Sequence, residues 1–540
     1  ANFAADVTFA DGADIITASA GTSNFRAGVN AGNSITSGGN YNVVVGDEAG
    51  TALTTGDQNT ILGYSAGVAL TTGLRNTLLG STAGDALVGA ERNTAVGYGA
   101  LHTETEGDRS TAVGVFALST QNTTGGGNIY NTAVGYAAGN AVTTGIKNTL
   151  LGSRSGDALT DADSNVAIGD SALSSDTLGS KSIAIGDSAL YAQNFTSATN
   201  TYNIAIGYEA GNAVTTGTNN TLIGGLAGDA ITTGGSNVAL GTSALSANTS
   251  ASNNTAVGYQ AGYTTTTGSY STSVGYQAHY SNTTGRNSAL GYVALRSNTT
   301  GTNNTAVGDS ALYSTTTGNY NTALGQEALQ ANTTASNNTA VGYQAGYTNV
   351  AAGAQVFVGY KAGYATTNGG GSSTFVGYEA GLSNTTGGNN TALGRGSFLD
   401  NTTGSNNVGL GYEALANNTT ASSNTAVGYQ ALYLNTTGAE NVAFGAYALD
   451  SVTTGSGNAA IGYGSGNTIT TGSKNTILGA YDGNQGGLDI RTASNNIVLS
   501  DGDGNPRVVV NSSGKVLCGL TDVIAGSRPE TLQTSGVSGS

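Results

Sequence analysis

The sequence predicts an all-β protein: a parallel β-solenoid (β-roll) of about 26 coils with a 17-residue period and short β caps at both ends. Three observations predict this fold class. The motif N-[TV]-[AL]-[VIL]-G recurs, and its glycine returns after 17 residues in 21 of 25 intervals. With 86 glycines, the chain is a poor helix former. Its many Val, Ile, Thr and Tyr residues suit strands, and seventeen residues suffice for one coil of a solenoid.

The repeat divides the chain into three parts. Twenty-six anchor glycines lie between Gly46 and Gly479, so we assign residues 42–482 to a repeat shaft. Residues 1–41 lack the anchor and form an N-terminal cap or attachment segment, because the end coils of a solenoid need covers. Residues 483–540 form a C-terminal β-hairpin cap and tail. In this last part strands are expected at 497–499, 507–510 and 516–518, with turns at 501–506 and 511–514.

Each position of the repeat has a predicted role. We number the asparagine 1 and the anchor glycine 5. Positions 2–4 are expected to form one strand, positions 7–10 a second strand, and the T-T-G segment the return turn. Stacking places equal positions above one another. Asparagines at position 1 then form a ladder of amide hydrogen bonds, and aliphatic residues at position 4 form the core. This structural ladder includes Asn254, Asn287, Asn304, Asn321, Asn338, Val257, Val274, Leu290, Val307 and Leu324.

The strand at positions 2–4 has two apolar faces. Position 4 is aliphatic in all copies but one, and position 3 is Ala in 16 of 26 copies. Neighbouring strand residues point to opposite faces, so one face can fill the coil and the other needs a second chain. This pattern favours a homotrimer packed around a shared axis. A monomeric solenoid with a wider interior is the alternative.

Composition and charge exclude several function classes. The net charge of −16 disfavours nucleic acid, and no apolar run is long enough to insert into a membrane. The two histidines, His102 and His279, lie on different coils and are expected at the surface, so no catalytic triad is predicted. The stretch DGDGN at 501–505 starts like a calcium loop, but its twelfth position is Ser512, which favours a hairpin turn. We expect no enzyme activity, metal or cofactor.

Tyrosines at position 6 are the candidate binding residues. Stacked phenols beside Asn and Thr suit carbohydrate, through ring faces and hydroxyl groups. The alternative is that the rings stack only on one another and stiffen the rod. The candidate glycan-contact ladder consists of Tyr259, Tyr276, Tyr292, Tyr343, Tyr360, Tyr378, Tyr412 and Tyr429. Two four-residue insertions, near 121–130 and 192–202, are further candidates for recognition. Aspartates at position 6 are expected to be solvated: Asp47, Asp170, Asp187 and Asp309.

The repeat resembles known fibre proteins. NTAVGYQAL, SNVAIGDSAL and KSIAIGDSAL resemble head repeats of YadA-type trimeric autotransporter adhesins, and the longer unit with N-T-T-G-x-N-N resembles repeats of phage tail fibres. The resemblance covers residues 42–482 and implies a trimeric parallel β-roll, left-handed in the adhesins. The period here is longer than the adhesin unit, and no heptad stalk or membrane-anchor strands are seen.

These observations predict a structural fibre protein with an adhesive role, a phage tail-fibre shaft that binds a bacterial surface glycan. The expected partners are further copies of the chain, as a homotrimer or filament, and a cell-surface polysaccharide. The expected location is extracellular, on a virion tail fibre or a cell surface. The alternative is a bacterial adhesin or a self-assembling extracellular filament. Ice binding is a weaker alternative, because it requires T-x-T on one face, whereas here adjacent threonines fall in a turn. A polysaccharide-degrading enzyme would need clustered carboxylates.

Overall fold

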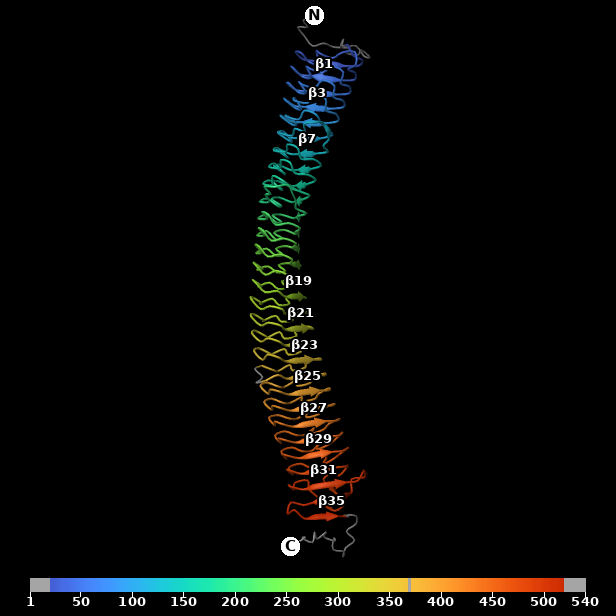
Figure 1. Cartoon of the computed structure of the whole chain (residues 1–540), viewed down its shortest axis with the longest axis vertical. Helices are drawn as coiled ribbons and strands as arrows, with labels where there is room; N and C mark the ends of the chain where they lie inside the picture. Colours follow the sequence, from blue (N-terminus) through green and yellow to red (C-terminus); the bar gives the residue numbers. More distant parts are fainter. Residues whose placement is uncertain (1–19, 368–370, 519–540) are drawn as a thin grey trace, which may run out of the picture. The chain divides into compact units, whose positions relative to one another are not determined.

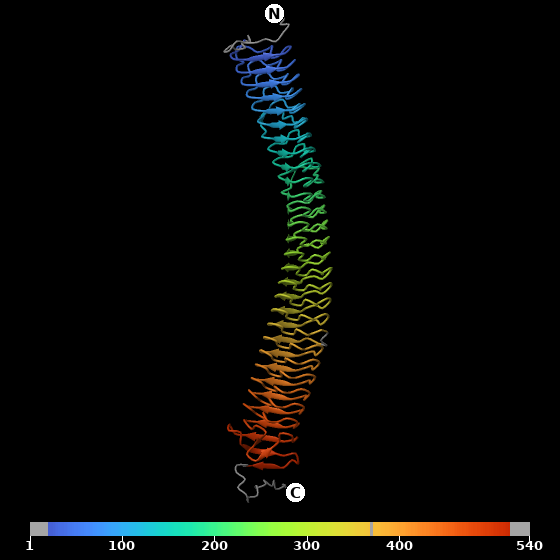
Figure 2. The same cartoon turned by 180° about the vertical axis from the view of Figure 1, so that it is seen from behind.

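The structure, a computed structural model, describes residues 20–367 and 371–518. They belong to two compact units, Ala1–Thr267 and Gly268–Ser540. Each unit is a parallel β-solenoid, and the described residues contain no helix. In both views, successive strands of a unit lie side by side, one below the other (Figures 1 and 2). This confirms the predicted fold class and period.

In the first unit, fourteen three-residue strands pair in parallel from coil to coil. The coil strands are β1 Phe25–Ala27, β2 Val43–Val45, β3 Thr60–Leu62, β4 Thr77–Leu79, β5 Thr94–Val96, β7 Thr111–Val113, β9 Thr132–Val134, β10 Thr149–Leu151, β11 Val166–Ile168, β13 Ile183–Ile185, β15 Ile204–Ile206, β16 Thr221–Ile223, β17 Val238–Leu240 and β18 Thr255–Val257. Two short pairs accompany the insertions: β6 Gly107–Asp108 with β8 Gly127–Asn128, and β12 Gly179–Ser180 with β14 Thr199–Asn200.

In the second unit, the described coils continue the same pattern and end in an antiparallel hairpin. The coil strands are β19 Thr272–Val274, β20 Ser288–Leu290, β21 Thr305–Val307, β22 Thr322–Leu324, β23 Thr339–Val341, β24 Val356–Val358, β25 Thr374–Val376, β26 Thr391–Leu393, β27 Val408–Leu410, β28 Thr425–Val427, β29 Val442–Phe444, β30 Ala459–Ile461, β31 Thr476–Leu478 and β34 Ile497–Ser500. The remaining strands, all antiparallel, are β32 Asn484–Gln485, β33 Leu488–Asp489, β35 Pro506–Val510 and β36 Val516–Cys518.

The ends of the stack differ from the predicted boundaries. Strand β1 pairs in register with β2, so a regular coil precedes residue 42. Strand β34 pairs in parallel with β31, so another coil follows residue 482. The predicted C-terminal hairpin is confirmed, except that Pro506 starts β35 instead of ending the turn. Residues 1–19 of the predicted N-terminal segment and the tail, residues 519–540, lie outside the described residues.

Each regular coil has one strand, and the expected second strand at positions 7–10 is wrong. This segment forms a tight turn with left-handed residues at positions 7 and 9, for example Glu327 with φ 57° and Leu329 with φ 50°. Left-handed φ values interrupt strand pairing, so no second ladder forms. The anchor glycine that begins the turn is obligatory. Gly325 has φ 135°, and a Cβ there would lie 2.5 Å from the carbonyl oxygen of Gly342.

The coil interior is lined by position 3, and the prediction that position 4 forms the core is wrong. Residues at position 3, such as Ala306 and Ala323, are fully buried. At position 4, Leu290 and Leu324 are 49% and 47% exposed, and Val257, Val274 and Val307 are half-buried. In a three-residue strand only the middle side chain points inward, because successive residues alternate faces. The position-4 residues do stack in register along the outer face, as in the pair Val307 and Leu324.

The predicted asparagine ladder is confirmed, and it also closes each coil. The backbone N–H of Asn321 donates to Asn304 Oδ1 (2.9 Å), and Asn338 N–H donates to Asn321 Oδ1 (3.0 Å). The Asn321 side-chain amide donates across its own coil to the carbonyl of Ala335 (2.9 Å). All three asparagines are buried, so these bonds satisfy polar groups that water cannot reach. The residue before position 1 has a left-handed conformation, for example Tyr320 with φ 56°.

Side-chain volume in the interior is balanced between positions 3 and 9. Where position 3 is Ala, position 9 is usually Leu, as in Ala323 with Leu329, both fully buried. Where position 3 is large, position 9 is Gly, as in Phe375 with Gly381, whose added Cβ would lie 2.5 Å from the ring. Protein interiors are close-packed. In most coils one large side chain, from either position 3 or position 9, therefore fills this space, whereas five coils, such as that of Ala340 and Gly346, have small residues at both positions.

Candidate functional site

The position-6 tyrosines lie on the outer surface at the start of the turn. Each follows the anchor glycine that ends a coil strand. Seven of the eight predicted residues are 38–56% exposed, and Tyr412 is half-buried. Tyr259 belongs to the first unit and the other seven to the second.

The rings of these tyrosines stack on one another along the coils. Ring centroids are 5.2 Å apart in Tyr276–Tyr292, 5.4 Å in Tyr343–Tyr360, 4.9 Å in Tyr360–Tyr378 and 5.1 Å in Tyr412–Tyr429, with interplanar angles of 6–17°. Ring faces inside a stack are covered by neighbouring rings. Sugars can therefore reach only the ring edges, the hydroxyl groups and the outer faces of the rings at the ends of a stack. Sugar contact with this ladder stays a prediction.

Cations are inserted in the tyrosine stack of the second unit. Arg395 occupies position 6, and its guanidinium carbon lies 5.6 Å from the ring centre of Tyr378 and 5.3 Å from that of Tyr412. Its Nη1 donates to the Tyr412 hydroxyl (2.7 Å). Lys361 lies over Tyr360 and Tyr364. Cation–π contacts of this kind fix both partners. The stack is thus a polar, partly cationic ridge in an acidic chain.

An open pocket of about 440 Å³ adjoins the Tyr276–Tyr292 pair. Arg296 lies in it, with its guanidinium between the rings of Tyr280 and Tyr313, at 5.3 and 5.9 Å. The pocket is lined by Tyr276, Gln277, Tyr292, Val293, Arg296, Ser310, Tyr313 and Gln330. This grouping of one cation, two amides and several phenols was not predicted. The sequence spacing could have predicted this grouping, because stacking places the residues of positions 6, 7 and 10 on the same side of consecutive coils.

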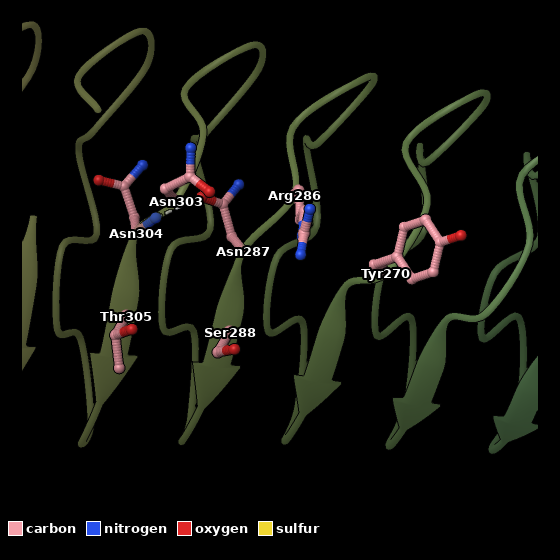
Figure 3. A pocket seen from close by; sticks show the side chains of 7 residues that line it. All are labelled: Tyr270, Arg286, Asn287, Ser288, Asn303, Asn304 and Thr305. Carbon is pink, nitrogen blue, oxygen red and sulfur yellow. Dashed lines mark hydrogen bonds between the residues drawn. The ribbon is translucent and has the colours of Figure 1, made fainter. Parts of the chain in front are cut away.

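A second pocket, of about 410 Å³, lies at the edge of the outer strand face (Figure 3). It is lined by Tyr270, Arg286, Asn287, Ser288, Asn303, Asn304 and Thr305. The Arg286 guanidinium lies 5.3 Å from the ring centre of Tyr270. The coil that contains Arg286 has 16 residues, one fewer than the regular coils.

The prediction of two surface histidines holds for one of them. His102 is exposed, and its Nδ1 lies 2.6 Å from Asp85 Oδ1. His279 is fully buried, because it occupies position 9, where the next coil places Leu295. Its Nδ1 lies 3.3 Å from Ser273 Oγ and its Nε2 3.1 Å from Asn287 Nδ2. Burial lowers the pKa of His279 to about 3.

Buried acidic side chains hold the two inserted loops in place through hydrogen bonds. Glu104 is fully buried and accepts hydrogen bonds from Gly107 N–H (2.7 Å) and from the Gln121 side chain (2.9 Å). Seventy-two residues on, Asp176 accepts from Gly179 N–H (3.0 Å) and from the Gln193 side chain (2.6 Å). Burial raises the pKa of Asp176. These acids occupy position 12, a buried position that is aliphatic or a neutral polar residue, most often Asn, in the other regular coils, so they order the loops and do not form a solvent-facing site.

The remaining acidic positions show no metal centre. In the described part of the chain, no three His, Cys, Asp or Glu side chains are placed to hold a metal ion. Asp501 accepts hydrogen bonds within its own turn, from Asn505 N–H (2.8 Å), and pairs with Arg507. The hairpin-turn interpretation of 501–505 is confirmed. The aspartates at position 6 are exposed, as predicted.

The fold and the exposed residues define a β-solenoid repeat protein with a tyrosine ridge. No family model and no curated protein matches the chain. Across residues 20–367 and 371–518, there is no helix with the length and apolarity needed to cross a bilayer.

Proposed function

We propose that this chain is a structural fibre protein with an adhesive role, the shaft of a phage tail fibre, assembled from three parallel copies and binding a bacterial surface glycan. One observation carries the proposal. The outer strand face, formed by positions 2 and 4, holds no charged residue in any described coil. It consists almost entirely of Thr, Val, Ile and Leu.

An uncharged, largely aliphatic face of a parallel sheet is expected to be buried against another protein surface. Parallel sheets occur almost only with both faces buried. Here the inner face packs inside the coil, while Leu290, Leu324, Leu393 and Leu478 on the outer face are 46–51% exposed. Extended apolar patches on a soluble chain mark association sites. A second and third copy, aligned coil to coil, present the same uncharged columns to this face.

Solution mass tests the assembly. One chain weighs 53.0 kDa, so light scattering should give three times this mass. Leu290→Glu with Leu324→Glu should shift the mass toward one chain, because two carboxylates per subunit would be buried in the interface. The matched control is Leu434→Glu, which alters an exposed leucine outside the strands and should leave the mass unchanged. A wild-type mass of one chain overturns the trimer.

Adhesion and source are tested separately. Binding of the wild-type chain to bacterial surface polysaccharides, with no change in polysaccharide length, supports an adhesive and non-catalytic role. Electron microscopy with an antibody against the chain should label fibres at virion tails. Label on a cell surface, or on long uniform filaments, would instead support the adhesin or filament alternative.

Ice binding is the second candidate for the same face. The structure places a column of position-2 threonines, such as Thr305, Thr322 and Thr339, on a flat sheet face beside the aliphatic column. The sequence alone had drawn attention to the turn threonines. A face buried in a trimer cannot contact ice, so thermal hysteresis together with a one-chain mass would replace the fibre proposal.

A further inference from the structure

We propose that the Arg296 pocket binds a carboxylate-bearing sugar of a surface polysaccharide. The inference rests on the proposed glycan adhesion and adds the chemical class of the ligand and the residue that selects it. The pocket is in the second unit, on the same side as the Tyr276–Tyr292 pair, and its volume of about 440 Å³ is within the range of small-molecule sites.

The guanidinium is held in place before any ligand arrives. Arg296 Nε donates to Gln277 Oε1 (3.0 Å), and Nη1 donates to the Tyr313 hydroxyl (3.3 Å). The rings of Tyr280 and Tyr313 lie on either side of it. A side chain fixed by stacking and two hydrogen bonds loses little conformational entropy on binding.

The charge of Arg296 is not neutralised by the protein. None of the four ion pairs among the described residues includes it. Two acids on this side of the coils have other partners: Ser310 Oγ donates to Asp309 (2.7 Å) and Gln344 donates to Glu327 (2.7 Å). A guanidinium has five N–H groups, and the two bonds above use two of them. The others can form the paired hydrogen bonds that a carboxylate accepts from arginine.

The surrounding groups suit a sugar ring. The amides of Gln277 and Gln330 can donate to and accept from sugar hydroxyls. The Ser310 hydroxyl, which donates to Asp309, can accept from them, and the tyrosine edges supply phenol groups. Neutral sugars would satisfy these groups but leave the guanidinium unpaired. The pocket should therefore prefer the acidic sugar to its carboxyl-reduced form.

The Arg395 sandwich provides a matched control. Arg395 also lies between two tyrosine rings and donates to a tyrosine hydroxyl, but it is exposed on the ridge. Arg395→Gln removes the same charge from the same unit. Arg296→Gln should abolish the acid preference, Arg296→Lys should reduce it, because the planar fork is lost, and Arg395→Gln should retain it.

The test is calorimetry of the full chain with oligosaccharides ending in glucuronate, galacturonate or N-acetylneuraminate, each compared with its carboxyl-reduced counterpart. We expect at least one acid to bind ten- to 100-fold more tightly than its reduced form, and Arg296→Gln to remove this difference while its circular dichroism is unchanged. Equal binding of all acids and reduced forms, or an acid preference that survives Arg296→Gln, overturns the inference and leaves glycan adhesion standing. Absence of binding to these probes and to every surface polysaccharide overturns both.

Discussion

Acid should destabilise the coil that contains His279. The ring is fully buried, and its neighbours fix its protonation. Asn287 Nδ2 can only donate, so the facing Nε2 must accept (3.1 Å), and the proton resides on Nδ1, which faces Ser273 Oγ (3.3 Å). The Asn287 amide is itself oriented, because it donates to Gly301 O (2.8 Å). Protonated His279 would place its Nε2–H against the Asn287 amide donor, and burial lowers the pKa of His279 to about 3.

The sign and size of the effect follow from linkage. An unfolded histidine has a pKa of 6.5, and the folded one about 3. Between these values the unfolded chain binds one more proton than the folded chain, so stability is complete above pH 6.5 and is lost as the pH falls. The loss is about 1.4 kcal/mol, or about tenfold in the opening equilibrium, for each pH unit. At pH 6.5 the unfolded histidine is already half protonated, so between pH 6.5 and pH 4.5 the coil should open about 50-fold more often.

Hydrogen exchange of residues 271–290, corrected for the intrinsic pH dependence, measures this opening. The comparison variant combines Ser273→Ala with His279→Leu, which copies the Ala289–Leu295 pair of the next coil, also fully or almost fully buried. In this variant the part of the acid sensitivity that is due to His279 should disappear, although the carboxylates of the chain still titrate. The reasoning is refuted if wild type and variant lose protection equally, or if the carbon-13-labelled His279 ring protonates near pH 6.5.

Three further predictions concern the asparagine ladder, the anchor glycine and the packing of the coil interior, and each is tested by the midpoint of urea unfolding. Asn321→Ala leaves the buried N–H of Asn338 unpaired and removes one of the two hydrogen bonds to the Ala335 carbonyl, so it should lower the free energy of unfolding by about 1–3 kcal/mol. Thr322→Ala on the outer face should lower it by less than about 0.5 kcal/mol; equal losses would contradict a ladder role. Gly325→Ala forces a side chain into a glycine-only conformation against the next coil and should cost at least about 1–3 kcal/mol; an unchanged midpoint would contradict that geometry. Phe375→Ala should lower the free energy of unfolding by about 3–5 kcal/mol. Gly381→Leu alone should lower it by about 1–3 kcal/mol, but added to Phe375→Ala it should recover part of the loss. Additive effects would contradict the exchange of side-chain volume between positions 3 and 9.

The sequence was sufficient to predict the period, the stack and the asparagine ladder, because each depends on residues that recur at one spacing. Which face of the strand points into the coil was not predictable in the same way. Both position 3 and position 4 are apolar, and only the turn geometry decides which enters the coil. The Leu at position 9 fills the room that Ala at position 3 leaves, as in Ala323 and Leu329.

The candidate site was predicted in part. The tyrosine column is exposed, as its spacing suggested, but the mutual stacking of rings depends on side-chain rotamers that a repeat pattern does not specify. Arg296 and Arg395 were overlooked because each occurs once at its position. His279 was misplaced because the left-handed turn directs position 9 inward, and that turn had been predicted as a strand.

The asparagine ladder has a consequence for how such a gene can change. Each regular coil offers the next one the same donors and acceptors, as the matching bonds of Asn304, Asn321 and Asn338 show. Unequal recombination between distant copies should therefore give folded chains that are longer or shorter by whole periods. Insertions that are not whole periods are accommodated in the return segment, where the two four-residue additions occur, while a shift inside the strand would turn its buried residue outward.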